Sequence, residues 1–177
     1  MNRLILMRHG KTEPWFEGVD DHGRALTTRG SADGLLMAKA LAAAGLEPAS
    51  ALISTARRTR ETWAALSGAF RKTDVAYLDD LYLATPDQIE DAVQGTTTDG
   101  TLMVLGHNPG IHDFACHIAR RGGAVSDLLT ARLWEKFPTS CCAIFENKSD
   151  GPFAVDKFKL VDVIRSRDLR APSLDGE

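Results

Sequence analysis

The chain has 177 residues, of which 44% are hydrophobic and 25% are charged, and its formal net charge is -3. This length and composition predict one compact domain with an ordinary buried core. The negative net charge argues against a nucleic-acid-binding protein, which usually carries an excess of basic residues on one face. Any phosphate that this protein binds must therefore be held by a local group of cations.

The apolar runs of the chain are short and its cysteines are few. The longest runs, at 4–7 and 102–105, fall far below the ~20 residues that a membrane-spanning helix needs, and the N-terminus has no signal-peptide pattern. The cysteines Cys116, Cys141 and Cys142 form no disulfide framework. We therefore expect a cytoplasmic protein that contacts no membrane.

Strands and helices are expected to alternate along the chain. A strand at 3–7 is followed by a helix at 27–45, a strand at 51–53 and a helix capped by Thr55. Next come a strand at 75–78, a helix at 86–93, a strand at 101–105 and a helix at 111–120. A helix at 124–135 then precedes a hairpin of strands at 141–146 and 153–161, joined by a turn at 147–152.

This order predicts an α/β fold, a three-layer sandwich with a mainly parallel central sheet. Residues 1–165 are expected to form the single domain. Residues 166–177 are polar enough for a C-terminal tail.

Polar clusters follow three of the predicted strands at the point where each strand ends. Arg8 and His9 follow the first strand, residues 54–58 follow the second, and His107 and Asn108 follow the strand at 101–105. Parallel α/β sheets bind ligands outside the carboxyl ends of their strands. We therefore expect the three clusters to meet in one crevice.

Arg58 is the most informative residue of these clusters. In the first turn of a helix its charge opposes the macrodipole, and it shares an inward stripe with Thr62, Ala65, Leu66 and Ala69. A bound phosphate would offset both costs, because guanidinium groups match phosphate oxygens with bidentate hydrogen bonds. Arg57 and Arg60 lie on other faces and are expected to be solvated.

Two histidines complete the predicted site. An imidazole beside two guanidinium groups is biased toward its neutral form, and a neutral ring nitrogen is a nucleophile, so His9 could accept a phosphoryl group. His107 would hydrogen-bond the transferring oxygens, with Asn108 or Ser54 to orient it. Each residue alone has a structural interpretation, but their order and placement together favour phosphoryl transfer.

These residues resemble the motifs of the histidine phosphatase superfamily. That family has an Arg-His-Gly after the first strand, a Ser-x-x-x-Arg-[Ala/Thr]-x-x-Thr segment and a Gly-His third motif. This sequence has Arg-His-Gly at 8–10, Ser-Thr-Ala-Arg-Arg-Thr-Arg-Glu-Thr at 54–62 and Gly-His-Asn-Pro at 106–109. The match covers roughly residues 4–160.

Within the family, the chain looks most like the SixA-type phosphohistidine phosphatases. Its Asp-His-Gly-Arg-Ala-Leu-Thr at 21–27 resembles their Asp-x-x-Arg-Pro-Leu-Thr, and Leu-Tyr at 81–82 and Phe-Pro-Thr at 137–139 also fit. Ala25 stands where proline is usual and Glu61 where glutamine is common. Neither departure removes a group that the chemistry needs.

The resemblance implies a phosphoglycerate mutase-like fold and hydrolysis of phosphohistidine through an intermediate on His9. Arg8, Arg58 and His107 would bind the phosphate, with no metal and no organic cofactor. The residues expected to contact the rest of the substrate are Gly10, Asp21, Arg24 and Asn108. The partner would be a phosphorylated protein or a small phosphate-bearing molecule.

Larger relatives use a carboxylic acid to protonate an alcohol leaving group. Here Asp80 and Asp79 are the first candidates for this proton donor, and Glu13 and Asp21 follow. Phosphohistidine has less need of such an acid, because an imidazole leaves as a neutral ring once it is protonated.

Two other functions stay open at this point. One is a general phosphomonoesterase of the same superfamily that acts on a small phosphate ester. The other is a non-catalytic phosphate-binding module. A pure binder needs the positive charge but not a nucleophile, so the presence of His9 counts against it.

Other residues have competing interpretations. The pairs His112 with Cys116 and Asp113 with His117 have the i, i+4 spacing of a metal site. They point about 100° apart on a helix, so we expect structural roles.

Aromatic residues divide into two groups. Trp15 and Phe16 either pack at the rim of the site or form a platform for substrate. Trp63, Trp134 and Tyr82 are expected in the core.

Overall fold

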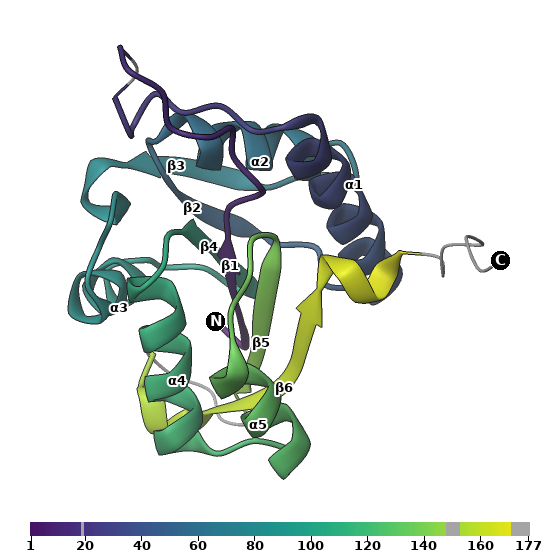
Figure 1. Cartoon of the computed structure of the whole chain (residues 1–177). Coiled ribbons are helices and arrows are strands. Elements are labelled where there is room, and N and C mark those ends of the chain that lie inside the picture. Colours follow the sequence, from purple (N-terminus) through teal and green to yellow (C-terminus); the bar gives the residue numbers. More distant parts are fainter. Residues whose placement is uncertain (19, 148–152, 171–177) are drawn as a thin grey trace, which may run out of the picture.

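The computed structural model describes residues 1–18, 20–147 and 153–170. Within them, one six-stranded sheet has the order β3-β2-β4-β1-β5-β6 (Figure 1). Its strands are β1 (Arg3–Arg8), β2 (Ser50–Ser54), β3 (Asp74–Leu78), β4 (Thr101–Gly106), β5 (Cys141–Asn147) and β6 (Phe158–Arg165). β1, β2, β3 and β4 are parallel, and β5 runs antiparallel to both of its neighbours. The predicted α/β fold with a mainly parallel sheet is confirmed.

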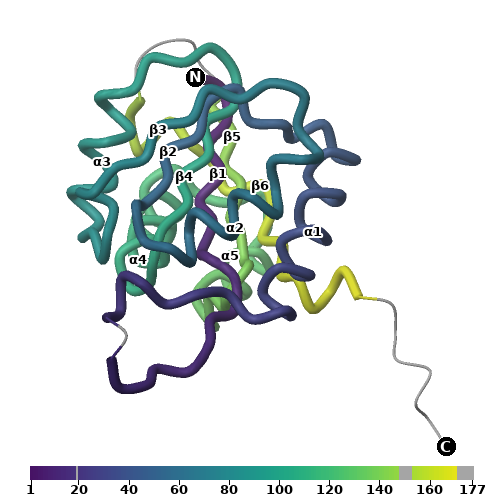
Figure 2. Tube along the Cα trace, turned by 90° about the horizontal axis from the view of Figure 1, so that it is seen from above, coloured from purple at the N-terminus to yellow at the C-terminus, as the bar shows by residue number. Residues whose placement is uncertain are grey.

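Helices cover both faces of the sheet and make the three layers (Figures 1 and 2). One face packs against α1 (Thr28–Ala43) and α2 (Arg57–Ser67), and the other against α3 (Pro86–Gln94), α4 (Gly110–Gly122) and α5 (Asp127–Glu135). Short 3-10 helices occur at η1 (Asp79–Leu81), η2 (Val155–Lys157) and η3 (Ser166–Leu169). No helix in the described ranges is long and apolar enough to cross a bilayer.

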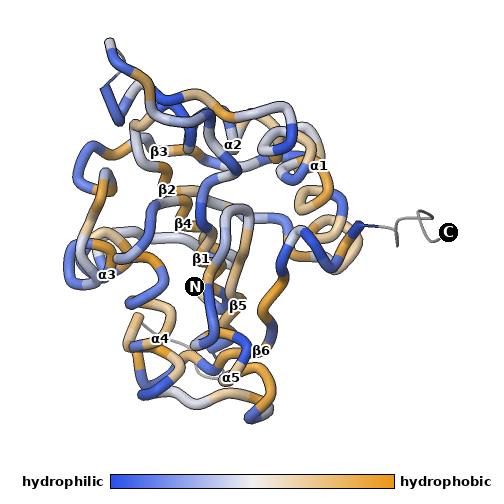
Figure 3. Tube along the Cα trace, viewed as in Figure 1, coloured by the Kyte–Doolittle hydropathy of each residue, from blue (hydrophilic) through white to orange (hydrophobic). Residues whose placement is uncertain are grey.

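The central strands consist mainly of apolar residues (Figure 3), and these pack on both faces of the sheet, because helices cover both faces. In β1, Leu4 and Leu6 pack toward α4, whereas Ile5 and Met7 pack toward α1, and all four are fully buried. Burial of one such side chain stabilises the fold by about 1.5–3 kcal/mol. This core holds the strand ends, and the polar residues that follow them, in fixed positions.

Some of the helices begin where the sequence predicted, and others do not. The Thr27 hydroxyl caps α1 by accepting from the amide of Gly30. The prediction that Thr55 caps α2 is wrong, because α2 follows Ala56 without a side-chain cap and the Thr55 hydroxyl donates to Asp79. α5 begins three residues later than predicted, because Ser126 caps it.

Near the C-terminus, the bounds of the last strand and of the tail differ from those predicted from the sequence. β6 runs over Phe158–Arg165 and not over 153–161, because residues 155–157 form η2. The start of the predicted tail forms η3, which packs with Leu169 against the α1 side of the core. Residues 148–152 of the predicted turn and residues 171–177 of the predicted tail lie outside the described residues.

Candidate active site

The three polar clusters meet at the carboxyl ends of β1, β2 and β4, as predicted. The rings of His9 and His107 have centroids 5.2 Å apart, and Nε of Arg58 lies 3.2 Å from Nδ1 of His107. Parallel pairing of β1 with β4 and of β4 with β2 brings these strand ends side by side. We call Arg8, His9, Arg58 and His107 the arginine–histidine cluster.

His9 presents a free ring nitrogen. Its Nδ1 lies 2.8 Å from the carbonyl oxygen of Gly10, which can only accept, so Nδ1 carries the proton and Nε2 keeps its lone pair. Burial, followed by the charges of Arg58, Arg8 and Arg24, lowers the pKa of His9 to about 4, although the bond to Gly10 acts in the opposite direction. At neutral pH the ring is therefore uncharged, and its Nε2 has the lone pair that a nucleophilic attack requires.

Gly10 allows the turn after β1 to pack closely. A Cβ there would stand 2.9 Å from the carbonyl oxygen of Gly30 in α1. The amide of Gly10 donates to the Thr62 hydroxyl at 2.9 Å, which ties the turn to α2. Since this amide is already bonded, Gly10 supports the site by close packing rather than by offering its N–H to a substrate.

Arg58 points inward from the first turn of α2, as predicted, and is almost fully buried. Its charge has an internal counter-ion that the sequence did not indicate. Nη2 donates to Oδ2 of Asp21 at 3.0 Å, and Nη1 donates to the Asp21 carbonyl oxygen. The guanidinium is thus oriented before any phosphate arrives.

Asp21 is bonded by three side-chain donors. Arg24 donates to Oδ1 at 3.0 Å, while Arg58 and the Tyr82 hydroxyl donate to Oδ2. Burial would raise the pKa of Asp21, but the bonds from Tyr82 and Arg24 and the charge of Arg58 outweigh it and lower the pKa to about 2. Asp21 and Arg24 therefore lie beside the arginine–histidine cluster, and these bonds favour the ionised form of Asp21.

Tyr82 belongs to the site and not to the core. Its ring packs edge-on against His107 with centroids 5.5 Å apart, and the guanidinium of Arg58 lies 5.7 Å from its centroid. The core prediction missed this, although the Leu-Tyr pair of the family resemblance pointed to the position.

His107 has partners on both ring nitrogens. Nδ1 accepts from Nε of Arg58, so in the neutral ring Nε2 carries the proton and donates to the Ser54 hydroxyl at 2.8 Å. Burial and the charge of Arg58 lower the pKa of His107 to about 3. Of the two residues expected to orient His107, Ser54 does so, whereas Asn108 donates to the carbonyl oxygen of Phe137.

Arg8 has an unpaired donor. Its Nη1 donates to the carbonyl oxygen of Phe137 at 3.0 Å, but its buried Nε has no partner among the described residues, and neither does Nε of Arg24. Buried polar groups are rarely left unpaired in folded proteins. Three guanidinium groups therefore lie close together, and among the described residues Asp21 is the one carboxylate bonded to them. This excess of positive charge is the kind that attracts an oxyanion.

Known proteins are similar to this chain in sequence and in structure. Residues 4–82 match the family model of the histidine phosphatase superfamily, branch 1. An uncharacterized protein of Mycobacterium tuberculosis is 32% identical over 139 residues, covering 78% of this chain and 85% of the relative. The chain belongs to the histidine phosphatase superfamily. It also spans 57% of an uncharacterized chloroplastic protein of Arabidopsis thaliana, with 30% identity.

Among solved structures, those of SixA proteins are similar in fold to this histidine phosphatase. A candidate phosphohistidine phosphatase SixA from Agrobacterium tumefaciens is 29% identical with a TM-score of 0.78, covering 93% of this chain and 97% of that chain. A phosphoglycerate mutase from Plasmodium falciparum, 14% identical with a TM-score of 0.57 and covering 99% of this chain and 96% of that one, shares the fold. The chain is thus a SixA-like hydrolase of the phosphatase class with a phosphoglycerate mutase-like fold.

Of the carboxylates considered as proton donors, Asp21 alone touches the arginine–histidine cluster. Asp80 is exposed and lines a separate hollow with Gln88 and Asp91. Asp79 accepts from the Thr55 hydroxyl at 2.6 Å, and Thr55 in turn contacts His22. The structure therefore does not bring Asp80 to His9.

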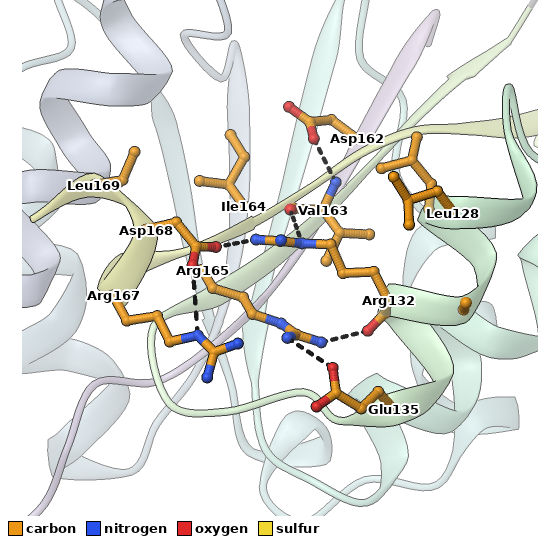
Figure 4. Close-up of a pocket in the computed structure, with 12 residues that line it drawn as sticks. Leu128, Arg132, Glu135, Asp162, Val163, Ile164, Arg165, Arg167, Asp168 and Leu169 are labelled. Carbon is orange, nitrogen blue, oxygen red and sulfur yellow. Dashed lines mark hydrogen bonds and ion pairs between the residues drawn. The ribbon is translucent and has the colours of Figure 1, made fainter.

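Arg165 supports the site from a distance, and no pattern in the sequence indicated this role. It is 1% exposed, and it donates to Glu135 and to the carbonyl oxygens of Arg132 and Lys136 at the end of α5 (Figure 4). The next residue, Phe137, supplies the carbonyl oxygen that both Arg8 and Asn108 bind. Arg165 thereby fixes the segment that positions Arg8.

A hollow of about 810 Å³ lies between α5, β6 and η3, beside Arg165 (Figure 4). On its wall, Arg132 donates to Asp168 and to the carbonyl oxygen of Val163, while the Val163 amide donates to Asp162. The polar side chains of this wall are thus bonded to one another and to β6.

The remaining histidines of α4 do not gather into a metal site. Nε2 of His112 lies 2.8 Å from the carbonyl oxygen of Leu133, and its ring stacks on Phe137. No group of three His, Cys, Asp or Glu side chains in the described ranges could hold an ion. Trp63 is buried as predicted, but the core prediction for Trp134 is wrong, because it is 47% exposed with Arg120 over its ring.

Proposed function

We propose that this phosphatase hydrolyses phosphohistidine, and that the phosphoryl group passes through His9 on its way to water. The proposal draws support from the unprotonated Nε2 of His9, which lies among three guanidinium groups that attract a phosphoryl dianion. Arg8 and Arg58 bind the phosphoryl oxygens, and His107 donates to one of them.

The reaction takes two transfers. The lone pair on Nε2 of His9 attacks phosphorus, the P–N bond of the substrate breaks, and its electron pair goes to the leaving imidazole, which takes up a proton from solvent. A water molecule then attacks phosphorus, the bond to His9 breaks, and inorganic phosphate leaves while a proton of that water passes to phosphate or solvent. Guanidinium groups fixed beforehand stabilise the charge on the phosphoryl oxygens in both steps.

One observation favours phosphohistidine over a phosphate ester. Among the described carboxylates, only Asp21 touches the arginine–histidine cluster, and its pKa of about 2 keeps it ionised, so it has no proton to give. An alkoxide leaving group needs an acid, whereas an imidazole can take its proton from solvent. The site is therefore better suited to a phosphoramidate than to an alkyl ester.

The test compares phosphate release from phosphohistidine and from an aryl phosphate, in parallel and with a chelator present. The wild type should prefer phosphohistidine, and His9→Ala should be inactive on both. His117→Ala, which removes a histidine of α4 outside the cluster, is the matched control and should keep full activity. An acid-labile phosphoenzyme should be trapped in the wild type and not in His9→Ala.

The same assay distinguishes the phosphomonoesterase alternative. If Asp80→Asn lowers turnover of a simple alkyl phosphate, added as a further substrate, by orders of magnitude, Asp80 acts as the acid and a phosphate ester becomes the better substrate. If His9→Ala equals the wild type, the nucleophile assignment is refuted.

A further inference from the structure

The segment between β1 and α1 carries two large apolar side chains that point into solvent. Trp15 is 65% exposed and Phe16 is 59% exposed. Their segment projects from the body of the molecule beyond the carboxyl ends of the parallel strands (Figures 1 and 2). The sequence left two roles open for these rings, packing at the rim of the site or a platform for substrate. Packing would remove the rings from water, so it does not fit their exposure.

The base of this segment is tied to the catalytic residues. Nη2 of Arg24 donates to the Thr12 hydroxyl at 2.8 Å and to the carbonyl oxygen of Glu13 at 2.9 Å. Through Nη1 the same guanidinium holds Asp21, which in turn holds Arg58. Trp15 therefore lies two residues after Glu13, whose carbonyl oxygen is bonded to Arg24. This places Trp15 at the edge of the site.

The charges around the two rings are opposite in sign to those of the site. Glu13, Glu17 and Asp20 are exposed, with Lys11 as the nearest cation along the chain. Neither glutamate has an ion-pair partner in the described part of the chain, and Asp20 accepts only from the amide of Gly23. A surface that is basic at the cluster and acidic around Trp15 fits a partner with the reverse pattern.

We propose that Trp15, Phe16 and Glu17, which we call the aromatic rim, bind the protein that carries the phosphorylated histidine. The surface of that protein beside the phosphohistidine is apolar and bears lysine or arginine side chains. The inference rests on the proposed function, since the phosphoryl group must reach His9 while the flanking surface lies on the rim. Exposed aromatic side chains of this kind supply much of the binding energy at protein interfaces.

A membrane surface is a poorer occupant for the same rings. The cytoplasmic leaflet is negatively charged and attracts basic segments, whereas Glu13 and Glu17 flank Trp15 and Phe16. A protein substrate with apolar and basic side chains can pack against the two rings and pair its cations with the two carboxylates.

The test uses three phosphohistidine probes: the free phosphorylated amino acid, a peptide with leucine and lysine around the phosphohistidine, and a peptide with serine and glutamate there. Trp15→Ala/Phe16→Ala should lower kcat/KM for the leucine–lysine peptide about tenfold or more. It should change kcat/KM for the free amino acid by less than about twofold, because it leaves the arginine–histidine cluster intact.

Glu17→Gln should lower the same kcat/KM at low salt, and the loss should shrink as salt rises, since exposed charges are screened. Leu128→Ala is the matched control, because Leu128 is 78% exposed on α5 and lies away from the rim. It should behave as the wild type on all three probes.

The inference is overturned if the double variant loses activity equally on the peptides and the free amino acid, or keeps full activity on the leucine–lysine peptide. It is also overturned if sedimentation shows that the rings join two copies of this chain while peptide turnover is unchanged. Failure of the proposed function has a different signature, namely that the wild type does not hydrolyse free phosphohistidine.

Discussion

Replacement of Ser54 by alanine should impair catalysis, because the Ser54 hydroxyl allows His107 to change its tautomer. In the structure, Nδ1 of His107 accepts from Arg58, and Nε2 donates to Ser54 at 2.8 Å. When His107 binds a phosphoryl oxygen through Nδ1, that oxygen replaces Nε of Arg58 as the partner of Nδ1, while Arg58 stays bound to the phosphoryl group. The oxygen has no proton to give, so Nδ1 must then donate and Nε2 must accept. A hydroxyl group serves both states because it can donate and accept.

The size of the effect follows from burial. Ser54 is fully buried, so alanine leaves one nitrogen of His107 without its partner in either tautomer. Such a bond contributes about 1 kcal/mol between neutral groups and up to about 3 kcal/mol when a charge is involved. We therefore expect kcat/KM for free phosphohistidine to fall roughly 5- to 150-fold. Ser54→Thr keeps the hydroxyl and should retain most of the activity.

Nitrogen NMR of the histidine rings gives a direct readout of the same idea. In the free wild type, His107 should be protonated on Nε2, and with tungstate bound it should be protonated on Nδ1. His9 is an internal reference, because its bond to Gly10 keeps the proton on Nδ1 in the free protein. Full activity of Ser54→Ala, or an unchanged or doubly protonated His107 in the complex, would refute the reasoning.

Five further outcomes are expected. Since the pKa of His9 is about 4 and the neutral ring reacts, kcat/KM should stay level as the pH falls from 7 and decline only near 4; a decline near 6.5 would contradict this. In denaturant titrations the free energy of unfolding should fall between about pH 6.5 and 4, because the unfolded histidine takes up a proton that the folded one does not. Asp21→Asn should lower kcat/KM about fivefold, a modest loss because Asp21 is partly exposed, and an unchanged value would show that Arg58 is held without it. Gly30→Ala should destabilise the protein by about 1–3 kcal/mol in urea unfolding, because its Cβ would stand 2.2 Å from the carbonyl oxygen of Lys11, whereas a gain of about 1 kcal/mol would show that helix propensity wins. Arg165→Met should lower the free energy of unfolding by about 1–3 kcal/mol, because it leaves the carbonyl oxygens of Arg132 and Lys136 without this donor; a free energy equal to that of the wild type would contradict the role of Arg165.

The sequence predicted those parts of the site that depend on single strand ends. Arg8 ends β1, His107 directly follows β4, and Arg58 lies on a helical stripe, so local pattern and sheet topology were enough to place them. The resemblance to a known family then supplied the chemistry.

The parts that were missed depend on contacts between distant segments. The carbonyl oxygen of Phe137 binds Arg8 across 129 positions of the chain, and no side-chain pattern marks a carbonyl oxygen. Arg165 is a buried cation whose partners are 29 or more positions away, whereas composition alone assigns arginine to the surface. Trp134 was expected in the core, but the guanidinium of Arg120 lies over its ring, and this cation–π contact stabilises the ring at the surface.

The bonds around Val163 have a consequence for how molecules of this protein meet one another. β6 is an edge strand, and such edges can template pairing with another chain and so lead to aggregation. Here the amide and the carbonyl oxygen of Val163 are both occupied, by Asp162 and Arg132. A strand from another molecule would have to displace the Asp162 carboxylate and the Arg132 guanidinium before it could pair with β6. These two side chains therefore oppose the growth of fibrils from the β6 edge of the sheet.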